Sequence, residues 1–200
     1  FLAYTGYAFH ADLIQFLTFG FGMNIMENLW QVVFLDVRLA VLLSVPLLTM
    51  RLVAEERRLG TLELLLTYPL SDRAVVAAKL GACLVVVLTL LGCTLVYPWW
   101  LYTQQPFPVG AVAAGYLGLF LLAAACASYG LFVSACTDSQ VLAGFLTLLP
   151  LLLMWFLSWN EATSPGGTLP VVQAISLFNH FQPFTVGVID ARDVFFFVFL

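Results

Sequence analysis

The chain has 200 residues, of which 62% are hydrophobic and only 9% are charged, and its net charge is −4. Because a water-soluble domain carries about 25% charged residues, this composition excludes a soluble enzyme and predicts an integral membrane protein. The sequence also lacks a glycine-rich phosphate loop and a basic patch for nucleic acid, so any ATP that drives the protein is bound by another chain.

Apolar stretches along the chain predict the transmembrane helices. A spanning helix needs about 20 apolar residues, and four complete stretches qualify: 34–54, 75–102, 109–136 and 139–159. Residues 1–10 are typical of the end of a first span, and residues 193–200 of the start of a last one. We therefore expect a single all-α transmembrane domain over residues 1–200, a polytopic helical bundle with six transmembrane helices in the intact protein.

The connecting segments differ in character. Residues 11–32 predict an outer loop, and residues 137–140 a tight inner turn in which Asp138 can cap the next helix. The long outer segment 160–192 contains two apolar pieces, 169–178 and 184–189, which are too short to cross a bilayer. These pieces are expected to lie in, or dip into, the outer leaflet as a re-entrant or interfacial segment.

The basic residues predict the orientation. Five of the seven flank the loop 55–73: Arg51, Arg57, Arg58, Arg73 and Lys79. Loops rich in Lys and Arg face the cytoplasm, so the loop 55–73 is expected there. The same orientation brings all five tryptophans to the outer interface, as an aromatic belt: Trp30, Trp99, Trp100, Trp155 and Trp159.

The cytoplasmic loop is expected to contain a short helix. Gly60 breaks the descending helix, Thr61 is a good N-cap, and Glu63 falls in the first turn, where its charge suits the helix dipole. The helix should run from about Leu62 to Tyr68. Pro69 ends it, and Ser71 or Asp72 then caps the next span.

This loop helix is largely apolar, because Leu62, Leu65 and Leu66 fall at positions i, i+3 and i+4. Seven residues cannot span a bilayer, so the leucines need another cover. The candidates are a groove on a partner protein, the inner surface of the protein itself, and the lipid interface. The pattern by itself leaves these candidates open.

A family resemblance favours the partner. In residues 46–82, "TMR" precedes "AEE", and then come "GTLELLLT", "PLSD" and Lys79. This order resembles the coupling region of type-2 ABC transporter permeases, in particular the subfamily related to the gliding-motility permeases. Two further pieces, "SACTDSQ" (134–140) and "GVIDARD" (187–193), are similar more weakly.

The resemblance implies a permease subunit of an exporter-type ABC transporter in a bacterial inner membrane, paired with a second copy or a related permease. A cytosolic ATP-binding-cassette subunit would hydrolyse the ATP, so the chain would be no enzyme and would hold no cofactor or metal. The loop helix would be the coupling helix, and a rigid continuation from Arg51 to Glu56 would pass its movement to the second span. The expected coupling residues are Arg51, Glu55, Glu56, Arg57, Arg58, Gly60, Thr61, Leu62, Glu63, Leu65, Leu66, Pro69 and Lys79.

Two alternatives stay open from the residues. Glu55 and Glu56 are similar to the paired glutamates of an intramembrane metalloprotease, but Gly60 stands where that pattern has an arginine, and His10 and His180 are expected on the opposite side of the membrane. The second alternative is an ATP-independent channel or carrier. Such a protein would be expected to show acidic residues or broken helices near the midplane, and the complete spans show almost none.

Overall fold

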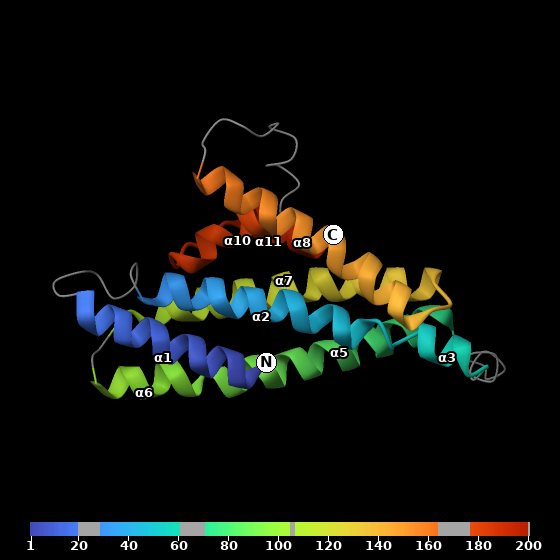
Figure 1. The fold of residues 1–200 in the computed structure, drawn as a ribbon, viewed down its shortest axis with the longest axis horizontal. Coiled ribbons are helices and arrows are strands. Elements are labelled where there is room, and N and C mark those ends of the chain that lie inside the picture. The colour runs from blue at the N-terminus through green and yellow to red at the C-terminus, as the bar shows by residue number, and fades with distance from the viewer. Residues whose placement is uncertain (20–28, 61–70, 105–106, 164–176, 200) are drawn as a thin grey trace.

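The computed structural model describes residues 1–19, 29–60, 71–104, 107–163 and 177–199, and within these ranges every regular element is a helix. The helices are α1 (Leu2–Phe19), α2 (Gln31–Thr49), α3 (Ala54–Arg58), α5 (Asp72–Thr94), α6 (Val96–Gln104), α7 (Val109–Cys136), α8 (Gln140–Thr163), α10 (Leu177–Thr185) and α11 (Ala191–Phe199). Figure 1 shows α1, α2, α5, α6 and α7 running lengthwise together, whereas α8 slants away and α10 and α11 lie against α7.

The lengths and compositions of these helices fit a membrane protein. Three helical stretches in the described ranges are long and apolar enough to cross a bilayer: Gln31–Arg58, Arg73–Gln104 and Val109–Cys136. A shorter apolar helix covers Gln140–Phe156. In the stretch that contains α5, only 17% of the most apolar window is buried against the protein, so most of this surface is available to lipid. The protein is an all-α polytopic membrane protein.

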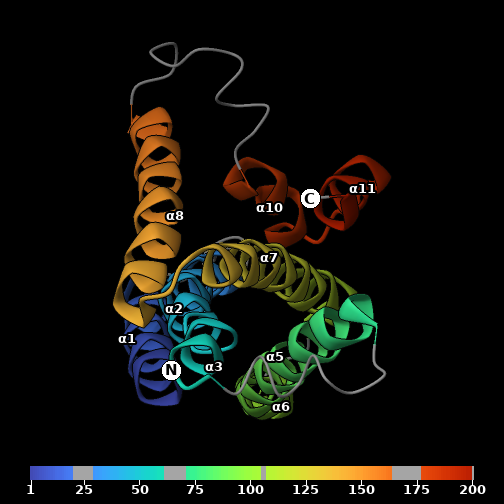
Figure 2. The same cartoon turned by 90° about the vertical axis from the view of Figure 1, so that its right-hand side faces the viewer.

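The helix α7 forms the centre of the bundle and contacts α2, α5, α8, α10 and α11 (Figure 2). Its small residues permit these contacts. A Cβ on Gly115 would lie 2.3 Å from the ring of Phe34, and a Cβ on Gly130 would lie 2.2 Å from Oγ1 of Thr49. Because Phe34 and Thr49 stand near opposite ends of α2, the two helices touch closely along most of their length.

An aromatic cluster fills the core at the end of the bundle opposite α3. Trp30 is fully buried there, with its ring 5.3 Å from that of Phe107 and 6.4 Å from that of Phe9. The expected place of Trp30 in an aromatic belt is therefore wrong, because its side chain packs inside the protein. Trp99 and Trp100 do lie on the surface, as a belt requires.

Several helix boundaries differ from those predicted. The span expected over 75–102 is divided into α5 and α6, and α8 extends beyond residue 159 to Thr163. The helix α1 continues to Phe19, although residues 11–32 were expected to form a loop. Its second half is helical because Leu13 and Phe16 pack against the core. The helix α2 ends at Thr49, and a turn separates it from α3. The segment Arg51–Glu56, expected to continue rigidly from the second span, therefore consists of this turn and the start of α3.

The helix α10 packs against α7. Phe181 and Phe184 of α10 are fully buried, and Gly118 of α7 leaves the space that Phe184 occupies. After α10 the chain turns at Gly187, which has φ of +84°. Of the two apolar pieces predicted in this segment, residues 169–176 lie outside the described part, while the piece 184–189 contains the end of α10 and this turn.

Candidate functional site

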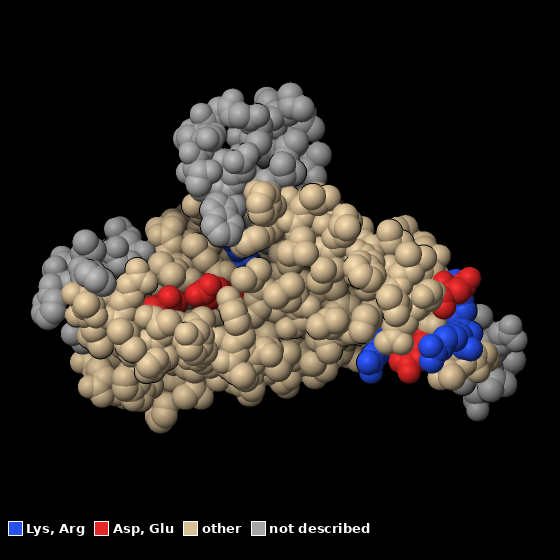
Figure 3. All heavy atoms as spheres, in the orientation of Figure 1, with Lys and Arg blue, Asp and Glu red and all other residues tan. Residues whose placement is uncertain are grey.

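Charged side chains gather at the end of the bundle where α3 lies (Figure 3). Seven of the thirteen residues predicted to couple the chain to an ATPase are described, and all seven stand at this end: Arg51, Glu55, Glu56, Arg57, Arg58, Gly60 and Lys79. The other six lie outside the described residues, and with them the predicted helix Leu62–Tyr68: Thr61, Leu62, Glu63, Leu65, Leu66 and Pro69.

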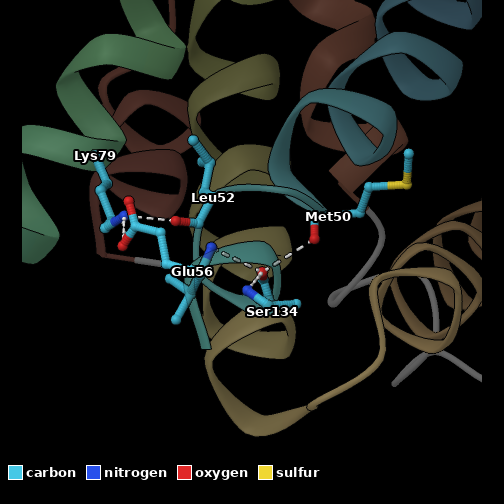
Figure 4. A network of polar contacts seen from close by, with 7 residues as sticks. Met50, Leu52, Glu56, Lys79 and Ser134 are labelled. Carbon is cyan, nitrogen blue, oxygen red and sulfur yellow. Dashed lines mark hydrogen bonds and ion pairs between the residues drawn. The ribbon is translucent and has the colours of Figure 1, made fainter. Parts of the chain in front are cut away.

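Ser134 of α7 holds the turn between α2 and α3. Its Oγ accepts hydrogen bonds from the backbone N–H groups of Val53 and Ala54, at 3.3 and 3.1 Å, and donates one to the carbonyl oxygen of Met50, at 3.4 Å (Figure 4). The first N–H groups of a helix have no partner within it, and Val53 makes no side-chain cap for α3. A serine 80 residues away along the chain therefore takes the place of the local cap.

Lys79 binds the same segment from the side of α5. Its Nζ lies 2.6 Å from Oε2 of Glu56 and also donates a hydrogen bond to the carbonyl oxygen of Leu52 (Figure 4). The side chain of Lys79 is 14% exposed and that of Glu56 is 37% exposed. Partial burial weakens the screening by solvent, so this ion pair ties α3 to α5 more firmly than a surface pair would.

A third contact joins α3 to the turn before α8. Arg57 Nη1 lies 3.0 Å from Oδ1 of Asp138, but the side chain of Asp138 is 85% exposed. Exposed pairs of this kind contribute about 0–1 kcal/mol. The carboxylate of Asp138, for which the sequence predicted helix capping, thus contacts α3. At the start of α5 the predicted cap is confirmed, because Ser71 Oγ accepts a hydrogen bond from the N–H of Ala74.

Of the remaining described residues of the site, Arg51, Arg58 and Gly60 are exposed and Glu55 is half-buried. Gly60 follows α3 with φ of +70°, a left-handed conformation that favours glycine, and a Cβ there would meet no atom within 4 Å. The segment is therefore fixed to α5, α7 and the turn before α8, and it leaves the basic side chains of Arg51 and Arg58 exposed.

Ser134 and Asp138 are functional candidates that the sequence analysis did not select. Both belong to "SACTDSQ" (134–140), one of the two stretches whose resemblance to the permeases is weaker. The hydrogen bonds to α3 depend on a contact between segments 80 residues apart, which local patterns do not reveal. The resemblance of this stretch to the permeases was the sequence signal that could have pointed to Ser134 and Asp138.

The structure does not favour a metalloprotease centre. The described residues hold no group of three His, Cys, Asp or Glu side chains that could bind a metal ion. Glu56 is paired with Lys79. His180 lies on α10, where its Nδ1 is 2.6 Å from Oδ1 of Asp193 on α11, and its ring stacks on that of Phe196. This histidine and Glu56 belong to different parts of the fold.

Comparison with known families identifies the family of the chain. A family model described as ABC-2 family transporter protein matches residues 14–191, a range that includes α3, Lys79 and Ser134. Comparisons with curated proteins and with solved structures give no match. The matched range covers most of the chain, and the helices inside it are those of a multi-pass membrane protein. The chain therefore belongs to the ABC-2 transporter family, as a membrane-spanning transport subunit and not an enzyme.

Proposed function

We propose that the chain is the permease subunit of an exporter-type ABC transporter in a bacterial inner membrane, within the gliding-motility-like branch of the family. A separate cytosolic ATP-binding-cassette subunit binds and hydrolyses the ATP, and the permease works as a dimer with a second copy or a related permease. The observation that carries this proposal is the three-way attachment of α3 to α5, α7 and α8.

The contacts of α3 suit a segment that passes movement from a docked partner to the helix bundle. Charged and hydrogen-bonded contacts fix α3 to α5, to α7 and to the turn before α8. The chain then continues from Gly60 into the loop with the apolar residues Leu62, Leu65 and Leu66. In this proposal those leucines enter a cleft on the ATPase. A displacement of the docked loop then reaches α5, α7 and α8 together, and the transport step is a change between two arrangements of these helices.

A single substitution tests the docking. Leu65→Asp places a carboxylate in the proposed cleft, where it would be buried without a partner. We expect the full-length wild-type protein to co-purify in detergent with its ATP-binding-cassette subunit, and Leu65→Asp to lose that subunit at unchanged expression. Val109→Asp is the matched control, because Val109 is 56% exposed at the start of α7, the end of that helix opposite Ser134.

The outcomes separate the proposal from its alternatives. Loss of the ATPase from Leu65→Asp but not from Val109→Asp supports docking through the loop. Retention of the ATPase by both variants contradicts the role of the loop. If the wild-type protein retains no ATPase and still moves a solute in vesicles without ATP, the chain is a channel or carrier instead.

A further inference from the structure

One helix connects the two ends of the molecule. The helix α7 runs without interruption over 28 residues and contains no proline. Ser134, near its last turn, holds the start of α3, and Gly118, sixteen positions earlier, contacts α10. At 1.5 Å per residue the two contact points lie about 24 Å apart along the helix. A displacement of one end of α7 therefore moves the other.

The helix α10 and the turn after it are closely packed against α7. A Cβ on Gly118 would lie 2.6 Å from Cβ of Phe184, and a Cβ on Gly187 would lie 2.5 Å from Cβ of Ala111. Phe181 and Phe184 are both fully buried. Closely packed interfaces of this kind transmit displacement instead of absorbing it, so α10 is expected to follow any shift of α7.

The chain connects α3 to α2 through a turn, and α7 contacts the same turn. The helix α2 ends at Thr49, one short turn after Pro46, and residues 50–53 form a turn. Ser134 is fully buried and bonds to both sides of that turn, at Met50 and at Val53 and Ala54. Hydrogen bonds shielded from water are stronger than exposed ones. The buried serine therefore gives α3 a second connection, to α7, in addition to the chain link to α2.

We propose that Ser134 is a positioning residue for transport, which makes α7 move with α3 and so carries the movement of the ATPase-docking loop to α10 on the outer side. This inference rests on the proposed function. It differs from the expectation that the second span receives the movement, because it assigns that role to α7. Ser134 contacts neither ATP nor a transported molecule in this proposal.

The test compares two serines on the same helix. Ser134→Ala removes the bonds to the turn before α3. Ser128→Ala is the matched control, because the hydroxyl of Ser128 bonds to the carbonyl oxygen of Ala124 within α7 itself, at 2.9 Å. Spin labels at Gln182→Cys on α10 and Gln104→Cys on α6, both exposed positions, report the outer movement. The four native cysteines are replaced by alanine.

The measurement is the distance between the two labels in lipid nanodiscs that contain the full-length protein and its co-purified ATP-binding-cassette subunit. Distances are compared between the nucleotide-free complex and the complex trapped with ATP and vanadate. We expect a shift in the parent protein and in Ser128→Ala. In Ser134→Ala we expect that shift to fall at least fourfold, while the ATPase stays bound and still hydrolyses ATP.

The possible results distinguish failure of the role of Ser134 from failure of the proposed function. A full shift in Ser134→Ala, or loss of the ATPase from that variant, overturns the role of Ser134 and leaves the proposed function intact. Absence of an ATPase from the parent protein overturns both proposals. If Ser134→Ala does not fold, Gly118→Ala tests the other end of α7. It should keep the ATPase and lose the shift, and an unchanged shift in this variant overturns the proposal.

Discussion

At the scale of single residues, the side chains of Ser134 and Lys79 take the place of a cap and an ion pair formed within the segment of α3 itself. Ser134 satisfies the N–H groups at the start of α3, and Lys79 neutralises Glu56 while also binding the carbonyl oxygen of Leu52. Both come from helices that are distant in the sequence. The orientation of α3 therefore depends on the packing of the whole bundle and not on its own five residues.

The two ion pairs of α3 are expected to differ in their contribution to stability. Lys79→Met leaves a half-buried carboxylate without this cation and should lower the free energy of unfolding by about 1–3 kcal/mol, between the values for exposed and buried pairs. Arg57→Gln breaks a pair in which Asp138 is 85% exposed and should cost less than about 0.5 kcal/mol.

Reversible unfolding in mixed detergent micelles measures both changes. The double variant Lys79→Met with Glu56→Gln is the control, since removing both partners should recover part of the loss. Equal costs for Lys79→Met and Arg57→Gln would show that burial does not distinguish the two pairs.

At the scale of elements, the sequence predicts a helix well where neighbouring residues determine its ends, and poorly where contacts with distant residues determine them. The helix α7 occupies the residues predicted for a span, 109–136, because a long run of small and apolar residues between a proline and a polar turn defines it locally. The end of α2 at Thr49 was not predictable, because Ser134 stabilises the turn that follows it. The second half of α1 is likewise helical through packing of Leu13 and Phe16.

The same elements give a test of close helix contact. Gly130→Ala places a Cβ 2.2 Å from Oγ1 of Thr49 and should destabilise the protein by about 1–3 kcal/mol through overpacking between α7 and α2. Gly92→Ala on α5 meets no atom within 4 Å. It should be neutral or should stabilise the protein by roughly 0.5–1 kcal/mol, because alanine favours the helix.

The apparent melting temperature in detergent compares the two alanine variants. A melting temperature of Gly130→Ala equal to that of the wild type would mean that α2 and α7 separate easily at this point.

At the scale of the whole molecule, composition and charge predicted the class of the protein and the end of the bundle at which its candidate functional residues gather. The all-α membrane fold follows from the scarcity of charge, and the ABC-2 family from the order of short motifs around residues 50–79. The attachment of α3 and the docking of α10 on Gly118 did not follow, since both depend on contacts between remote segments.

Orientation is the prediction that belongs to this scale. In a variant without native cysteines, a membrane-impermeant maleimide should label Thr103→Cys, at the end of α6, in intact cells. It should label Arg58→Cys only in inverted membrane vesicles, because the positive-inside rule predicts that the basic loop faces the cytoplasm. Both positions are exposed, so access to the reagent depends on the side of the membrane. The reverse labelling pattern would contradict the orientation and, with it, docking of a cytosolic ATPase on this loop.

The fit of α10 against Gly118 has a consequence for biogenesis. Every residue of α7 that receives α10, including Gly118 and Ala111, is synthesised before Phe181, Phe184 and Gly187. Since N-terminal parts of a chain generally fold first during synthesis, we expect the surface for the two phenylalanines to be in place when they arrive. The helix α10 can then pack directly against α7.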